Sequence, residues 1–234
     1  ICRKQPGDLI NLLENEFTVF KLPKQAVLNC HGLEGRQLYE SWLGCSQEQD
    51  AVECLNVLAE ADISTAKWLV VDHYGLDAKW EKQMIMALSE KGSIPQLLAI
   101  DDLADRPHEA NLLLDSNFFG DATEQRYQGL VTKKCHTLLG PNYALLSPEY
   151  AQMRPLVPKR KHLNRVLIFF GGVDKDNLTS KALRAVMDPG LSGLYVDVVI
   201  GRQSPHWNTV KNLTDKLPNA TLHGPLPSLA GLMA

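Results

Sequence analysis

The chain has 234 residues, 44% of them hydrophobic and 22% charged, as in a soluble protein of one large or two small domains. Its formal net charge of −3 argues against nucleic acid as the main partner, because no basic stripe is available to neutralise phosphates. No apolar run approaches the roughly 20 residues that span a bilayer, and we expect no signal peptide and no membrane partner. The five cysteines form no Cys-x-x-Cys, so we interpret them as reduced thiols in a cytoplasmic protein.

Predicted helices and strands alternate along the first half of the chain. Their positions follow from apolar periodicity and from capping residues, and a polar, glycine-containing stretch over residues 32–44 predicts a loop. The predicted helices are Gly7–Glu16, a helix capped by Ser46 that ends at Glu60, and Ala78–Lys91, and the predicted strands are Thr18–Leu22, Trp68–Val71, Ile94–Ile100 and Asn111–Leu114.

The run Trp68–Val71 is uninterrupted and apolar, which is typical of a strand buried on both faces of a parallel sheet. An acid, an imidazole and a phenol follow it directly, at Asp72, His73 and Tyr74. In open α/β sheets, ligands bind beyond the carboxyl ends of strands, so these three residues are the candidate catalytic residues. The alternative is that Asp72 and Tyr74 only close a tight loop before Asp77 caps the next helix.

A proline-broken basic stretch over residues 153–164 predicts a linker. A second series of alternating elements follows it, so we expect two Rossmann-like domains, residues 1–154 and 164–234, whose parallel sheets face each other across a cleft. The predicted strands of the second domain are Arg165–Phe170, Tyr195–Ile200 and Ala220–His223, and its predicted helices are Asn177–Met187 and Pro205–Leu217.

Gly171 and Gly172 lie between a predicted strand and a predicted helix, where backbone amides can approach an anionic phosphate. A tight strand-to-helix turn explains two glycines equally well. The sequence Asp174-Lys-Asp176 is similar to the Asp-x-Asp of metal-dependent sugar transferases, but a helix cap at Asp176 or Asn177 is the favoured explanation. No set of His, Cys, Asp and Glu has metal-ligand spacing, so we expect no metal and no cofactor.

The segment Ile100–His108 contains three carboxylates, an arginine and a histidine after a strand. We interpret it as a loop held together by a pair between Asp105 and Arg106, and the alternative places Asp101 at the edge of a site. His223 and Gly224 also follow a predicted strand, which is the position that His73 takes in the first domain.

Several segments together resemble one known family, in the same order along most of the chain. That family is the UDP-2,4-diacetamido-2,4,6-trideoxy-β-L-altropyranose hydrolases of pseudaminic acid biosynthesis. The resembling segments are Val71–Asp77 with Trp80-Glu81, Ile100–Arg106, Leu139–Leu146, Phe169–Asp174 and Leu222–Pro227.

The resemblance implies a GT-B-like fold with UDP bound mainly by the second domain. It implies a hydrolase that needs no metal, in which water attacks the anomeric carbon of a UDP-linked diacetamido-trideoxy sugar with inversion. The implied partner is a small-molecule UDP-sugar. The candidate substrate-binding residues are Gly171, Gly172, Val173, His223, Gly224 and Leu226.

Two family segments have no counterpart here: an N-terminal Gly-x-Gly-His turn, whose His is the family's expected base, and a later Gly-Gly-Ala-Thr-x-Trp-Glu segment. The chain opens at Ile1 without Met and closes in an apolar segment, so we expect it to be an internal piece of a longer protein lacking both ends. The rival hypotheses are a UDP-sugar-dependent GT-B glycosyltransferase, which would need an acceptor groove, and a non-catalytic sugar-nucleotide-binding fragment, which would lack a base.

Overall fold

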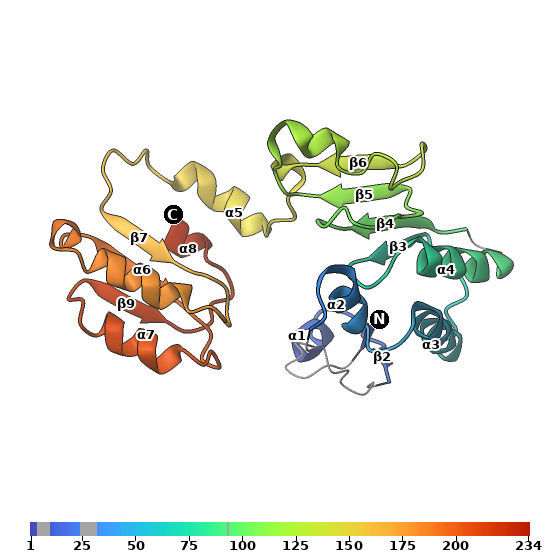
Figure 1. The fold of residues 1–234 in the computed structure, drawn as a ribbon, viewed down its shortest axis with the longest axis horizontal. Coiled ribbons are helices and arrows are strands. Elements are labelled where there is room, and N and C mark those ends of the chain that lie inside the picture. The colour runs from blue at the N-terminus through green and yellow to red at the C-terminus, as the bar shows by residue number, and fades with distance from the viewer. Residues whose placement is uncertain (4–9, 24–31, 93) are drawn as a thin grey trace. The chain divides into compact units, whose positions relative to one another are not determined.

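The computed structural model describes residues 1–3, 10–23, 32–92 and 94–234. Two compact units divide the chain, Ile1–Leu145 and Leu146–Ala234, and each has parallel strands and its own hydrophobic core. The predicted α/β class with parallel sheets is therefore confirmed (Figure 1). The units divide before the predicted boundary at residue 154, so that residues 146–154 belong to the second unit. That the two sheets face each other across a cleft stays a prediction.

The larger sheet of the first unit has four parallel strands in the order β3–β4–β5–β6. Val71 of β3 is in register with Ala99 of β4, and Asp115 of β5 is in register with Leu139 of β6. Because the strands are parallel, all four carboxyl ends lie along one edge of the sheet. The strands are β3 Trp68–Val71, β4 Gln96–Ile100, β5 Leu112–Asp115 and β6 His136–Leu139, and β1 Cys2–Arg3 and β2 Lys21–Leu22 form a separate parallel pair.

The helices of the first unit begin where the sequence provides caps. Ser46 accepts a hydrogen bond from the Gln49 amide, and Asp77 accepts one from the Lys79 amide, so both predicted caps are confirmed. Of the helix predicted from Gly7, residues 7–9 lie outside the described residues. The elements are α1 Ile10–Glu14, α2 Gly35–Ser41, α3 Gln47–Glu60, α4 Ala78–Glu90 and two 3₁₀ turns, η1 Gly120–Gln125 and η2 Pro141–Tyr143.

The core of the first unit lies between its sheet and helices α3 and α4, which contact each other. Met84 of α4 is buried in the same cluster as Leu97 and Leu113 of the central strands. Trp80 is buried too, and its indole donates a hydrogen bond to the Asp50 carboxylate of α3 at 3.0 Å. Burial of these apolar side chains therefore fixes α4 directly after the strand-end loop of β3.

Two predictions for the first unit are wrong. Strand β3 is not buried on both faces, because Trp68 and Val70 are 52% and 55% exposed and β3 is an edge strand among the described strands. The stretch predicted as a loop contains helix α2. Contacts distant in sequence stabilise that helix: the Arg36 guanidinium donates hydrogen bonds to the carbonyls of Tyr74 and Gly75.

The second unit is a three-stranded parallel sheet in the order β7–β8–β9, with α6 and α7 in contact with each other. Val198 and Ile200 are fully buried against Leu183 of α6 and Val210 of α7. Among the described residues, no helix is both long enough and apolar enough to span a lipid bilayer. The elements are α5 Pro148–Met153, η3 Arg154–Leu156, β7 Arg165–Ile168, α6 Leu178–Val186, η4 Pro189–Leu191, β8 Tyr195–Val199, α7 Trp207–Thr214, β9 Ala220–His223 and α8 Ala230–Met233.

Candidate functional site

The loop after β3 holds the three candidate catalytic residues. Asp72 is exposed, whereas His73 closes the turn, because its Nδ1 accepts a hydrogen bond from the Gly75 amide at 2.9 Å. A side chain at residue 75 would meet the Tyr39 carbonyl oxygen at 2.8 Å, so the turn requires glycine for close approach. The residue that closes the loop is therefore His73, and not Asp72 or Tyr74 as in the alternative interpretation of the sequence.

Tyr74 is half-buried, with its ring packed edge-on against Tyr39 at 5.4 Å between centroids and tilted against Trp42 at 6.1 Å. Hydrogen bonding to the Asp102 carboxylate, together with partial burial, raises the pKa of the Tyr74 hydroxyl to about 12. The phenol therefore stays protonated at neutral pH. Tyr74 can orient a bound group by hydrogen bonding, but it is not suited to act as a base.

A buried ion pair holds the loop after β4. Arg106 pairs with Asp101 at 2.7 Å, and both side chains are almost completely buried. Arg106 also pairs with Asp105 at 3.0 Å, which confirms the predicted local pair, and donates to the Leu76 carbonyl. Asp101 is thus part of the loop framework and does not lie at the edge of an open site.

His108 and Tyr127 complete this buried network. His108 Nδ1 lies 2.7 Å from a Glu81 carboxylate oxygen, and the Tyr127 hydroxyl donates to both Asp101 and Asp115. Burial alone would raise the pKa of Asp101, but the His108 hydrogen bond and the Arg106 charge hold that pKa well below its usual range. Burial alone would lower the pKa of His108, but its hydrogen bonds to Asp101 and Glu81 raise it. The network stabilises charged groups inside the unit.

The carboxyl edge of the second sheet brings together three strand-end loops. Gly172 lies in the loop after β7, and Gly201 lies in the loop after β8. The Gly201 amide donates a hydrogen bond to the Gly172 carbonyl oxygen at 2.8 Å. A side chain at residue 201 would lie 2.4 Å from the Gly172 carbonyl oxygen, so this contact requires glycine. The Arg202 guanidinium, one residue after Gly201, approaches Gly224 in the loop after β9. A Cβ atom at residue 224 would lie 3.2 Å from Arg202 Nε. The edge therefore combines accessible backbone with an exposed cation.

Among the other candidate substrate-binding residues, Val173 and Leu226 are exposed, and the Val173 carbonyl accepts a hydrogen bond from the Ser204 hydroxyl at 2.7 Å. His223 is more constrained, because its Nε2 lies 2.8 Å from a carboxylate oxygen of Asp197 in β8. Asp197 also accepts hydrogen bonds from Arg165, and these and the His223 contact lower its pKa despite burial. His223 is thus attached to the sheet through one ring nitrogen.

The amino terminus of α6 has a protein carboxylate as its cap. Asp174 accepts hydrogen bonds from the amides of Leu178 and Thr179, both at 2.9 Å. Asp176 or Asn177 is the cap predicted from the sequence, but Asn177 makes no side-chain cap bond. That expectation is wrong because the turn places Asp174, four residues before the helix, over its first amides. The amide groups of Leu178 and Thr179 at this helix end are therefore already bonded to a protein carboxylate.

Two residues at these edges were missed by sequence reasoning. Arg202 follows Gly201, which lies in the loop after β8. A glycine after a predicted strand is the same pattern that made Gly171 and Gly172 candidates, so this pattern could have predicted Arg202. Asp102 could not be distinguished from its neighbour Asp101, because the sequence does not show which of two adjacent acidic residues is buried. Asp102 approaches Tyr74, whereas Asp101 is committed to Arg106.

Comparison with known proteins finds two curated relatives. A UDP-2,4-diacetamido-2,4,6-trideoxy-beta-L-altropyranose hydrolase of Campylobacter jejuni is 31% identical over 127 residues, which cover 54% of this chain and 42% of that protein. The spore coat polysaccharide biosynthesis protein SpsG of Bacillus subtilis is 30% identical over 95 residues, covering 40% of this chain and 28% of that protein. No protein-family model matches the chain.

The predicted resemblance to the hydrolase is thus confirmed over part of the chain. The matched segments span less than half the length of either curated relative. Among solved structures, a crystal structure of MurG from Acinetobacter baumannii aligns with 98% of this chain and 60% of its own length, at a TM-score of 0.45 and 12% sequence identity.

Proposed function

We propose that the protein is a hydrolase that releases UDP from a UDP-linked 2,4-diacetamido-2,4,6-trideoxy sugar. The observation that carries the proposal is the 31% identity to a hydrolase named for this substrate class. The relative from Bacillus subtilis is named for polysaccharide biosynthesis, which is consistent with a nucleotide-sugar substrate.

In the proposed reaction, the oxygen of water forms a bond to the anomeric carbon while the bond from that carbon to the diphosphate breaks. UDP leaves with the bonding electrons and needs little protonation, and a base takes the proton from water. Attack from the face opposite the leaving group inverts the anomeric centre. Asp72, an exposed carboxylate at the end of β3, is the candidate base on this chain, and Tyr74 orients the water or a ring substituent.

We assign the diphosphate to the carboxyl edge of the second sheet. Gly172 is exposed, and a side chain there would meet nothing within 4 Å, so a ligand can approach its backbone. Arg202 adds a positive charge that suits two phosphate groups. The test of the whole proposal is chromatographic: UDP release in water without an acceptor supports a hydrolase, and release that requires a sugar or lipid acceptor contradicts it.

We expect Gly172→Val to weaken UDP binding about 10-fold or more, equivalent to ~1.4 kcal/mol. The added side chain has room in the folded protein, so its effect falls on the approach of the ligand. Titration calorimetry with UDP measures the affinity. Gly193→Val is the matched control, since a side chain at Gly193 also meets nothing within 4 Å. Equal UDP affinity in the two folded variants would contradict the assignment.

We expect UDP release to be the same with EDTA as with magnesium. Both oxygens of Asp174 accept amide hydrogen bonds, so the Asp174-Lys-Asp176 sequence does not offer a pair of available carboxylates. In the described part of the chain, no three His, Cys, Asp or Glu side chains are grouped to hold a metal. Activity that EDTA abolishes and magnesium restores would contradict this prediction.

A further inference from the structure

The side chain of Arg202 lies over the ring of Trp207, the first residue of α7. Its Cζ atom is 5.4 Å from the centroid of the indole ring, within the roughly 6 Å range of cation–π attraction. Trp207 is half-buried and packs against the core cluster of the second unit. The core thus fixes the ring on which the guanidinium lies.

The guanidinium has a second neighbour, the backbone of Gly224 in the loop after β9. A Cβ atom at residue 224 would lie 3.2 Å from Arg202 Nε and 3.7 Å from both Cζ and Nη2. A side chain at this position would crowd the guanidinium, so glycine allows Arg202 to lie close to the backbone. Arg202 is therefore an exposed residue whose side chain has defined contacts with two elements, α7 and the loop after β9.

The turn that joins Arg202 to Trp207 is fixed by Ser204, which is buried. The Trp207 amide donates a hydrogen bond to the Ser204 carbonyl oxygen at 3.1 Å. The Ser204 hydroxyl donates to the Val173 carbonyl oxygen at 2.7 Å, so the turn is also attached to the loop after β7. The cation and its aromatic neighbour are thus fixed relative to the carboxyl edge of the second sheet.

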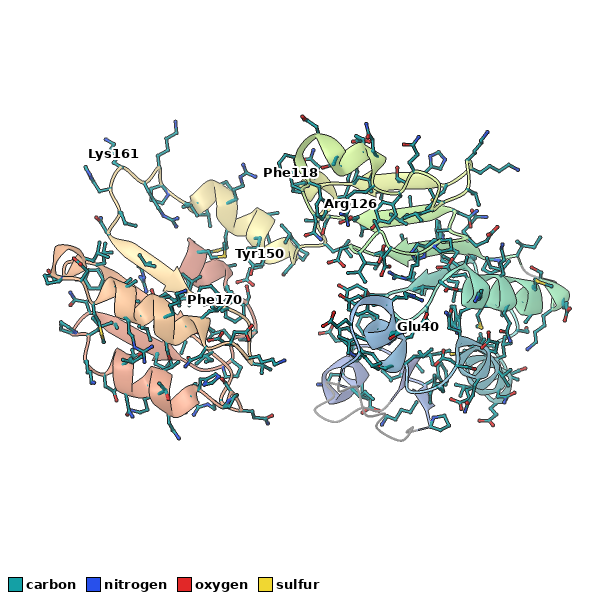
Figure 2. The ribbon with its side chains drawn as sticks, viewed as in Figure 1. Glu40, Phe118, Arg126, Tyr150, Lys161 and Phe170 are labelled. Carbon is teal, nitrogen blue, oxygen red and sulfur yellow. The ribbon has the colours of Figure 1, made fainter. Side chains whose placement is uncertain are left out.

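The positive charge of Arg202 has no counter-charge among the residues that the structure describes, since no carboxylate there forms an ion pair with it. The two buried acids of the described second unit are engaged elsewhere: Asp174 accepts hydrogen bonds from the first amides of α6, and Asp197 pairs with Arg165. Figure 2 shows Phe170 at the end of β7, where it is 47% exposed, so this edge of the sheet is open to solvent. A fixed cation at an open edge is suited to an anion from solution.

We propose that Trp207 is a positioning residue, which holds the Arg202 guanidinium where it pairs with the diphosphate of the UDP-sugar. The attraction between a ring face and a cation uses none of the N–H groups, so these remain available to phosphate oxygens. Because the side chain is already ordered, less conformational freedom is lost when the phosphates bind. This role rests on the proposed function, in which this edge of the sheet binds the diphosphate.

The first test measures UDP affinity by titration calorimetry. We expect Arg202→Met to weaken binding about 10-fold or more, and Trp207→Leu about 3-fold or more, because the guanidinium then loses its aromatic support. Trp207→Phe keeps an aromatic face and should bind UDP within about 2-fold of the unmodified protein. Lys211→Met removes an exposed cation of the same helix, paired with Asp215, and is the control that should leave the affinity unchanged. Equal UDP affinity in Trp207→Leu and Lys211→Met overturns the proposal.

A double-mutant cycle shows whether the ring acts through the cation. In an Arg202→Met background, Trp207→Leu should have no further effect on UDP affinity, and independent, multiplying losses overturn the proposal. Because Trp207 also packs against the core, thermal unfolding of each variant is measured in parallel. If Trp207→Leu does not fold, the exposed Arg202 decides: a UDP affinity of Arg202→Met equal to that of Lys211→Met overturns the proposal.

A third measurement needs no ligand. The ring current of the indole should shift the NMR signals of the Arg202 side-chain protons, assigned with Arg202→Met, and Trp207→Leu should abolish this shift. Signals at the positions of a free arginine in the unmodified protein overturn the proposal. If the variants change UDP affinity as expected but the protein releases no UDP from a UDP-sugar, the hydrolase function fails and the role of Trp207 stands. Release of UDP together with unchanged affinity in Trp207→Leu refutes the role of Trp207 alone.

Discussion

Replacing Arg106 with methionine is expected to destabilise the first unit by about 3–5 kcal/mol, the usual cost of removing one partner from a buried ion pair. The Arg106 and Asp101 side chains are 2% and 0% exposed, and they lie 2.7 Å apart. Without the guanidinium, the Asp101 carboxylate would remain in the interior without its strong cation, and the Leu76 carbonyl would lose a donor. Hydrogen–deuterium exchange of peptides covering β4 and β5 measures the loss within this unit.

Lys82→Met is the matched control for this prediction. Lys82 pairs with Glu109 at 3.2 Å, but its side chain is 59% exposed. Solvent screens such a pair, so its loss should change the stability by at most about 1 kcal/mol. If Arg106→Met and Lys82→Met had equally small effects, the buried network would not be a source of the unit's stability.

Tyr74→Phe is expected to lower the rate of UDP release on the order of 10- to 100-fold, equivalent to ~1.4–2.7 kcal/mol, if the hydroxyl orients water or substrate. The melting temperature should change little, because phenylalanine keeps the ring contacts with Tyr39 and Trp42. Steady-state kinetics and thermal unfolding of the same preparation separate the two effects.

Tyr143→Phe provides the comparison for Tyr74→Phe. It removes a hydroxyl from a tyrosine of the same unit that is 45% exposed and has no assigned role. Its rate should equal that of the unmodified protein. Normal turnover by Tyr74→Phe, combined with a large decrease in its melting temperature, would make Tyr74 a structural residue and shift attention to Asp72.

Local signals in the sequence were sufficient to predict much of the fold. The bounds of β3 and β9 agree with the prediction, since each is a short run that polar or turn residues interrupt at once. The caps at Ser46 and Asp77 were predicted for the same reason, because a cap bonds to an amide only two or three residues away.

Contacts between distant segments were beyond sequence reasoning. Helix α2 contains few apolar residues, and the Arg36 contacts that stabilise it reach 38 and 39 residues along the chain. The position of Asp102 beside Tyr74 depends on the register of β3 against β4, which is visible only in the folded sheet. The candidate residues at strand ends could be proposed from sequence, but their partners could not.

In the part of the chain that the structure describes, the outer edge of β3 is where the sheet can accept another strand. Among the described strands β3 pairs only with β4, so the outer backbone groups of Trp68–Val71 are a template for one more strand. A strand added in parallel would end beside Val71, and the loop that leaves it would lie next to Asp72 and Tyr74. A segment that paired with this edge would therefore place side chains next to the candidate site.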